Sequence, residues 1–441
     1  MIDLLKALTA LAFISSLFGE HLAFSSGKSV SSACQEAEAV FRDPEIQWMA
    51  VLCILVYLVI FAAMREQRLR RRITPKGGID HWRVAFLVIS TLVYFLNYQR
   101  ASQSTQTAIL LSGALIGSGV GVSLFWREEP GSNKQSLWRF VALMVIMLAI
   151  ACLWKSGYGS SFSYKKNARW VGPWDNPNLY GLLMASGAAL ALGLAFSSAG
   201  MVDASGSRRR YWNHLKSAMF LAAAGIMCFG LWKSYSRGAW VAADVGGWYL
   251  LIQWCKRTTH HWPLFTRHYF VAFAVCLLLV VLFWQYQHTE SVTAHRALSA
   301  SNQNDFSWRN RVAAWEGTLQ MMAERPWLGW GWNQPDPFYR HYYFTSRIDE
   351  TGAVQLNDYL MLGATLGIPA LFCFCMYLWL ALTQKLEIGN RKSEMAQLAW
   401  LKTVCRARAL VLAVGFWFDG GLFKLPTAAT FWILLELGRE N

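Results

Sequence analysis

The sequence predicts an all-α integral membrane protein with about twelve transmembrane helices and one long outer loop that carries an amphipathic helix. Three observations favour this class. Only 15% of the 441 residues are charged, whereas soluble domains are about 25% charged. Hydrophobic residues make up 55% of the chain and gather in runs of the length that crosses a bilayer. The 23 tryptophans are typical of membrane interfaces.

Apolar runs of about 20 residues each predict one membrane helix. The first run has no clean small-residue cleavage site after it, so it predicts a retained helix rather than a removed signal peptide. Residues 1–160 are expected to form an N-terminal helical region, and residues 161–441 a second region with its own outer loop. The candidate spans are approximately 2–19, 47–64, 83–98, 107–126, 137–154, 179–199, 217–232, 239–255, 269–285, 357–382, 407–421 and 426–438.

Charge gives the orientation of these helices. The net charge is +15, and the basic residues form short clusters between apolar runs, such as 70–72 and 208–210. The positive-inside rule places these loops, including 383–408, and both termini in the cytoplasm. This pattern argues against nucleic acid as a partner. The nine cysteines show no metal-ligand spacing, so no metal or cofactor is expected.

The remaining polar segments lie on the outer side, and the longest is the loop 286–356. Loops of this length are usually functional or disordered, and this one is rich in tryptophan. Val312, Trp315, Leu319 and Met322 recur at helical spacing, which predicts an amphipathic helix over 311–324 that Pro326 ends.

Candidate site residues occur at three places on this outer side. Arg237, followed by Gly238, joins two apolar helices, and it is either an anion clamp or an interfacial anchor. In the Gly-Pro-rich turn before residue 179, Asn176 or Asn178 either caps a helix or takes part in the site.

The third place is the long loop and its exit. Arg309 and Arg311 precede the amphipathic helix, with Trp315 on the same face as Arg311. Asn357 and Asp358 open the next apolar run. A carboxylate there is either at work or stabilised structurally by the helix N-terminus.

The order of these short motifs resembles the O-antigen ligase and polymerase superfamily over roughly residues 165–438. The matching pieces are Gly172-Pro173…Asn176-Pro177-Asn178, Ser236-Arg237-Gly238, Arg311-x-x-x-Trp315, Pro326-x-x-Gly329-x-Gly331, Asn357-x-Tyr359-Leu360…Gly367 and Asp419-Gly-Gly-Leu-Phe.

The resemblance implies a metal-independent glycosyltransferase of the bacterial inner membrane, with its active site facing the periplasm. A glycan would leave an undecaprenyl diphosphate carrier and join a glycan, lipid A-core or protein acceptor, as in lipopolysaccharide and other polysaccharide biosynthesis. The diphosphate would be held by Arg237, Arg311 and Arg309. Further substrate contacts would come from Asn176, Asn178, Asn357 and Trp315.

Residue 356 departs from the family pattern. Family ligases commonly have histidine immediately before the asparagine that aligns with Asn357, and here that residue is Leu356. Leucine accepts no proton, so a general base would be Asp358 or His341, brought in from the loop.

Two other classes of function remain. A transporter of a small anion or a lipid-linked sugar would carry ionisable groups at mid-membrane on broken helices. The predicted spans are nearly free of such groups, with Asp244 as the clear exception. A scaffold of an envelope complex would tolerate loss of Arg237 and Arg311.

Overall fold

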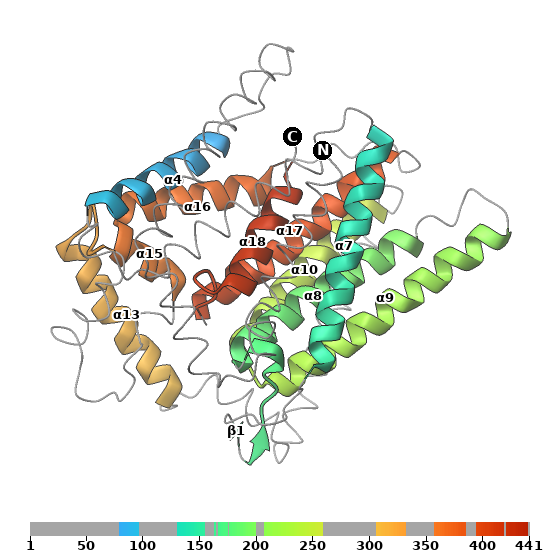
Figure 1. Cartoon of the computed structure of the whole chain (residues 1–441), viewed down its shortest axis with the longest axis horizontal. Coiled ribbons are helices and arrows are strands. Elements are labelled where there is room, and N and C mark those ends of the chain that lie inside the picture. The colour runs from blue at the N-terminus through green and yellow to red at the C-terminus, as the bar shows by residue number, and fades with distance from the viewer. Residues whose placement is uncertain are drawn as a thin grey trace, which may run out of the picture. The chain divides into compact units, whose positions relative to one another are not determined.

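The computed structural model describes residues 79–96, 130–154, 163–164, 166–174, 176–199, 207–258, 306–331, 357–384, 394–418 and 420–439. These parts of the chain are mainly helical (Figure 1). They divide into two compact units, one comprising residues up to Leu143 and from Arg311 onward, and the other Met144–Asn310.

The elements follow one another along the chain with one small hairpin among the helices. The hairpin strands pair antiparallel, with Ser163 opposite Ala168. The elements are α4 (Ile79–Leu96), α7 (Pro130–Leu153), β1 (Ser163–Tyr164), β2 (Asn167–Ala168), the 3₁₀ helix η1 (Gly172–Trp174), α8 (Pro177–Ala199), α9 (Ser207–Ser234), α10 (Arg237–Thr258), α13 (Phe306–Glu324), α15 (Asp358–Leu366), α16 (Ile368–Thr383), α17 (Glu394–Phe418) and α18 (Leu425–Leu437).

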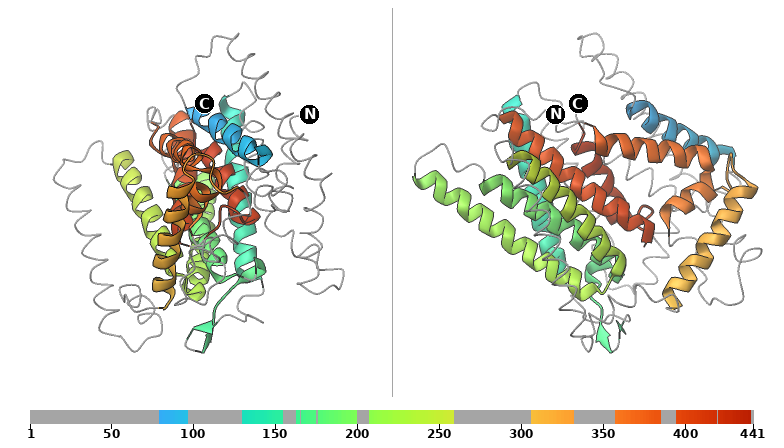
Figure 2. Two further views of the ribbon diagram at one scale, coloured as in Figure 1. Left: turned by 90° about the vertical axis from the view of Figure 1, so that its left-hand side faces the viewer. Right: turned by 180° about the vertical axis from the view of Figure 1, so that it is seen from behind.

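The second unit is built around α8, which packs against both α9 and α10 (Figures 1 and 2). Its sequence is rich in alanine and glycine, and small side chains let neighbouring helices approach closely. A methyl group at Gly181 would come within 2.6 Å of the Ser234 hydroxyl of α9. This close approach holds the end of α9 against the start of α8.

Two of the described helices are long and apolar enough to cross a membrane: Pro177–Ser197 in α8 and Tyr211–Ser234 in α9. They differ in exposure, because α8 is almost wholly buried whereas α9 exposes Met219, Leu221 and Phe229. Exposed apolar side chains along one helix are expected where the helix faces lipid. The predicted number of twelve spans stays a prediction.

The first unit has an aromatic core. Phe86 of α4 packs on Phe374 of α16, with ring centroids 5.4 Å apart, and also on Trp432 of α18. Phe416 of α17 meets Phe431 of α18 edge to face, at 5.1 Å. Aromatic rings bury large apolar areas, so these contacts hold α4, α16, α17 and α18 together.

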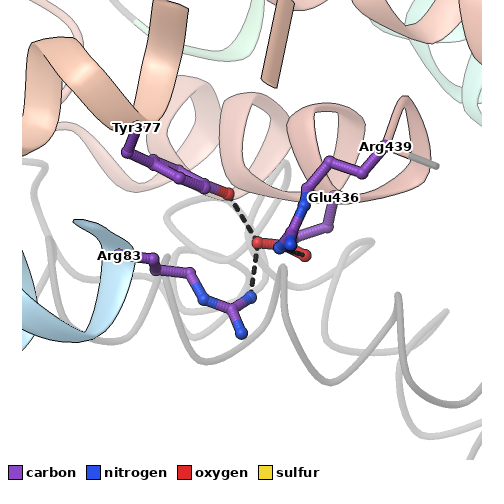
Figure 3. Close-up of polar contacts among 4 residues, drawn as sticks. All are labelled: Arg83, Tyr377, Glu436 and Arg439. Carbon is purple, nitrogen blue, oxygen red and sulfur yellow. Dashed lines mark hydrogen bonds and ion pairs between the residues drawn. The ribbon is translucent and has the colours of Figure 1, made fainter. Parts of the chain in front are cut away.

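A buried ionic network closes one end of this unit (Figure 3). Arg83 of α4 donates to Glu436 of α18 at 2.6 Å, and Tyr377 of α16 donates to the same oxygen at 2.5 Å. Arg439 donates to the other carboxylate oxygen at 2.9 Å. The expectation that the spans are nearly free of ionisable groups, with Asp244 as the clear exception, overlooked this pair: Glu436 lies in the predicted span 426–438 and Arg83 in the predicted span 83–98.

Four predicted spans are helices whose bounds agree within four residues: 83–98, 179–199, 239–255 and 426–438. The predicted spans 137–154 and 217–232 are also helical, but α7 and α9 begin earlier, at Pro130 and Ser207. A helix is observed where the amphipathic helix was predicted, and it begins at Phe306 rather than Arg311. Its buried face differs from the predicted stripe: Met322 is buried, whereas Leu319 is exposed, and Ala314, Thr318 and Met321 are buried instead. The predicted spans 2–19, 47–64, 107–126 and 269–285 lie outside the described residues, as does most of the loop 286–356.

Two predicted spans need correction. The span 407–421 is the end of a longer helix that begins at Glu394, so much of the predicted loop 383–408 is helical. The buried cations Lys402, Arg406 and Arg408 lower the hydropathy of the first part of this helix, so the sequence there was interpreted as a polar loop. The span 357–382 is two helices, α15 and α16, because the chain breaks at Gly367 (φ 88°) before Pro369.

Gly367 is required at this break. Its φ of 88° strains any side chain, and a methyl group would lie within 3.0 Å of the Leu328 backbone nitrogen. We expect Gly367→Ala to lower the free energy of unfolding by roughly 2–4 kcal/mol, measured by thermal unfolding in detergent. The matched control is Gly247→Ala, where no atom lies within 4 Å of the added methyl; an equal loss there would contradict the prediction.

Candidate functional site

Arg237 occupies the first turn of α10. Ser236 caps this helix, since its hydroxyl accepts from the Ala239 backbone N–H at 3.4 Å. Ser236 is buried, whereas Arg237 is half-buried. A cation is not favoured by the helix dipole at this end, so the dipole does not account for a cation in the first turn of α10. The guanidinium and the first N–H groups of α10 instead add positive potential at one place.

Arg169, which sequence analysis did not single out, ties the preceding turn together. Its Nε donates to the Ser234 carbonyl at 2.8 Å, and its Nη2 donates to Asn178 Oδ1 at 2.7 Å. The Trp170 backbone N–H also donates to the Lys233 carbonyl, at 3.1 Å. One guanidinium therefore links the start of α8 to the turn that presents Arg237.

The asparagines at the start of α8 have different structural roles. Asn176 caps the helix, because its Oδ1 accepts from the backbone N–H groups of Asn178 at 2.9 Å and Leu179 at 3.1 Å. Asn178 holds Arg169 instead. The capping alternative is thus confirmed for Asn176, and Asn178 connects this turn to the one before Arg237.

In the first unit, Asn357 caps α15. Its Oδ1 accepts from the backbone N–H groups of Tyr359 at 3.0 Å and Leu360 at 3.1 Å. These bonds fix the orientation of the amide. The Nδ2 group on the other side is buried and has no hydrogen-bond partner among the described residues, so it is available to donate to a bound molecule.

Asp358 clasps the connection between α17 and α18. The carboxylate is 2% exposed, and its Oδ2 accepts from the backbone N–H groups of Gly421 at 2.6 Å and Leu422 at 2.7 Å. This contact joins the Asn357 motif to the terminal Asp419-Gly-Gly-Leu motif. A structural role for Asp358 is therefore supported by two specific hydrogen bonds, from the backbone N–H groups of Gly421 and Leu422.

Loss of this clasp has a predictable cost. We expect Asp358→Ala to destabilise the protein by roughly 2–4 kcal/mol, because two buried backbone N–H groups lose their acceptor. The measurement is the thermal midpoint in detergent. Asp244→Ala is the control, since Asp244 is exposed on α10, and it should change the midpoint little. An unchanged midpoint in Asp358→Ala would show that the N–H groups find other acceptors.

The glycine turn after α13 docks on the same helix α15. The backbone N–H groups of Trp330 and Gly331 donate to the carbonyls of Ala364 at 2.8 Å and Thr365 at 2.9 Å. A methyl group at Gly329, whose φ is 62°, would come within 2.5 Å of the Thr365 carbonyl. The Pro326…Gly331 motif therefore anchors the segment that follows α13 to α15.

An aromatic row connects α13 to the start of α15. Trp315 meets Trp417 of α17 with ring centroids 5.8 Å apart, and Trp417 meets Tyr359 at 5.9 Å. Arg311 lies one turn before Trp315 on α13 and is half-buried, whereas Arg309 is exposed. The half-buried Arg311 is thus on α13, and the aromatic row connects α13 to the start of α15, where Asn357 and Asp358 lie.

Each unit therefore brings together part of the predicted set. The second unit joins Arg237, Asn176 and Asn178 through Arg169, and the first unit gathers the residues of α13 and α15. Arg237 and Arg311 belong to different units, and their meeting at one diphosphate stays a prediction. His341 lies outside the described residues.

Sequence reasoning missed Arg169 and the donors at Gly421 and Leu422. One signal for Arg169 was available: it is a basic residue directly before the Trp170…Asn178 motif. No comparable signal marks backbone donors, because every residue except proline has an N–H group.

Comparison with known families covers part of the chain. Residues 222–375 match the family model described as O-antigen ligase. The matched range includes Arg237, Arg311, Asn357 and Asp358 and leaves out the asparagines before α8. No curated protein matches the chain closely enough to add to this. The match confirms the resemblance seen in the motifs and supports membership of the chain in the O-antigen ligase and polymerase superfamily through residues 222–375.

Proposed function

We propose that the protein is an inner-membrane glycosyltransferase that moves a glycan from undecaprenyl diphosphate to an acceptor, with the reaction on the periplasmic side. The family match supports a membrane glycosyltransferase role in polysaccharide biosynthesis. The donor, the acceptor and the residue roles below are part of the proposal.

The observation that carries the proposal is the construction around Arg237. A permanent cation sits in the first turn of a capped helix, and Arg169 and Asn178 fix the turn before it. Negative charge develops on the diphosphate as the glycan leaves, and preorganised cations stabilise that charge. Arg311 and Arg309 of α13 are proposed to supply further positive charge to the same group.

In the first unit, Asn357 is proposed to bind the substrate through its buried Nδ2. A hydroxyl or phosphate oxygen would satisfy this donor, which has no partner among the described side chains and backbone groups. Trp315 is proposed to offer an aromatic face to a sugar ring. The proposed base is His341 or Asp358; for Asp358 to act, Oδ2 would have to give up a backbone donor or Oδ1 would have to reach the acceptor hydroxyl.

Glycan analysis of a deletion strain tests the function directly. Carrier-linked glycans that persist at full length but never reach the acceptor would indicate ligation. A shortened ladder on the acceptor would indicate polymerisation. An unchanged glycan profile would contradict the proposal.

The same deletion strain distinguishes a transferase from a transporter of lipid-linked sugar. A transporter of lipid-linked sugar would leave the unused donor on the cytoplasmic leaflet, where a periplasmic glycosidase does not reach it. A periplasmic transferase would leave the donor accessible to that enzyme. Donor protected from glycosidase in the deletion strain would favour transport.

The Arg169 bridge gives a prediction about positioning. We expect Arg169→Met and Asn178→Ala each to lower transfer by roughly tenfold. Arg169→Met removes the bond to the Ser234 carbonyl, and Asn178→Ala removes the bond that orients the same guanidinium. The double variant should be little worse than either single variant, because both act on one interaction. Transfer is measured in isolated membranes. The control is Lys166→Asn, which changes an exposed cation in the turn between β1 and β2. Additive losses would show that Asn178 acts separately.

A further inference from the structure

Arg408 is a buried cation that no part of the proposed mechanism uses. It lies in α17 and is 0% exposed. Its three guanidinium nitrogens Nε, Nη1 and Nη2 are buried and have no hydrogen-bond partner in the part of the chain that the structure describes. Most buried polar groups in proteins are hydrogen-bonded. A buried guanidinium without acceptors is therefore an exception that needs an explanation.

The helix around Arg408 offers no acceptor. The residues one turn before and after it, Val404, Cys405, Val411 and Leu412, are buried and carry no carboxylate. These neighbours provide an apolar setting in which an unpaired charge is costly.

Nearby charge does not compensate for Arg408 either. Arg406, two residues earlier, donates its Nε to the Gly438 carbonyl at 2.7 Å, which sets this part of α17 beside the end of α18. That end holds Glu436, the only acidic residue classed as buried in the described part of α18, and Arg83 and Arg439 already bind it. Lys402 of α17 is a further buried cation. Cations thus exceed anions at this end of the unit.

Arginine does not escape the cost of burial by losing its proton. Its planar fork presents several donors that match the oxygens of a phosphate group. We propose that Arg408 binds a phosphate-bearing anion, either the headgroup of a membrane lipid or free phosphate, at its buried position in the middle of α17.

This site is separate from the substrate end of the same unit. Asp358 holds Gly421 and Leu422, which follow the last turn of α17. Arg408 lies ten residues before Phe418, which is about 15 Å along the helix axis. The carrier diphosphate proposed above would be bound at the other end, so loss of the Arg408 site does not depend on the proposed reaction.

The test uses full-length protein, delipidated in a maltoside detergent, and follows the thermal midpoint as a ligand is added. Inorganic phosphate is one arm, phosphatidic acid in mixed micelles is the second, and a phosphate-free glucosyl diacylglycerol is the control lipid. Both arms are run in an Arg237→Ala/Arg311→Ala background, so that the proposed carrier site contributes little. Sodium chloride at matched ionic strength corrects for screening.

We expect the midpoint to rise with phosphate, phosphatidic acid or both, and the Arg408→Met change to weaken the apparent affinity by roughly 10- to 100-fold. A rise with phosphate alone assigns the site to free phosphate, and a rise with the lipid alone assigns it to a headgroup. Without ligand, Arg408→Met should match or exceed the parent midpoint, because the change removes an unpaired buried charge. Arg408→Lys should bind with intermediate affinity.

Arg83→Met is the matched control. It removes another buried arginine at the same end, lowers the midpoint by breaking its pair with Glu436, and should keep the ligand-induced rise. The proposal is overturned if the parent protein responds to neither phosphate nor phosphatidic acid. It is also overturned if Arg408→Met and Arg408→Lys respond as strongly as the parent.

Discussion

Replacing Arg237 with alanine is expected to abolish glycan transfer and to leave the protein folded. The loss should be at least about 100-fold, the usual effect of removing one preorganised group that stabilises developing negative charge. Folding should be unaffected, because a cation in the first turn of α10 opposes the helix dipole. Transfer to acceptor in isolated membranes, normalised to the amount of folded protein, is the measurement.

Variants around Arg237 sharpen this test. Arg237→Lys should recover little activity, since a point charge lacks the planar fork. Lys256→Ala is the matched control: Lys256 is an exposed cation near the opposite end of the same helix, and its loss should leave transfer unchanged. Arg311→Ala should behave like Arg237→Ala if both hold one diphosphate. Normal glycan display in cells that carry Arg237→Ala would remove the clamp from the proposal.

The apolar patterning predicted most of the described helices, since burial of long apolar runs depends on composition that a sequence displays. It did not predict the break at Gly367, because that break depends on a distant partner: the Ile368 backbone N–H donates to the Pro326 carbonyl at 2.7 Å. It also placed the start of α17 too late. The buried cations Lys402, Arg406 and Arg408 looked like a polar loop in a hydropathy count.

The candidate site was predictable where a motif marks it. Arg237, Arg311 and Asn357 stand in short motifs whose order is specific, and the family match covers them. The partners of these residues were not predictable, because Arg169 lies outside the motifs and reaches Ser234 and Asn178 only through the fold. A motif thus marks candidate side chains, whereas tertiary contacts determine which groups hold them.

The network around Glu436 gives the prediction with the largest expected effect on stability. Glu436→Leu should lower the free energy of unfolding by about 3–5 kcal/mol, because it leaves the Arg83 and Arg439 guanidinium groups buried without their shared carboxylate. The thermal midpoint in detergent measures this loss, and Glu324→Leu at an exposed position of α13 is the control. Replacing Arg83 with methionine as well should restore part of the stability, since one unpaired cation disappears together with the anion. A double variant that is less stable than Glu436→Leu would show that Arg83 stabilises α4 through its packing rather than through this charge.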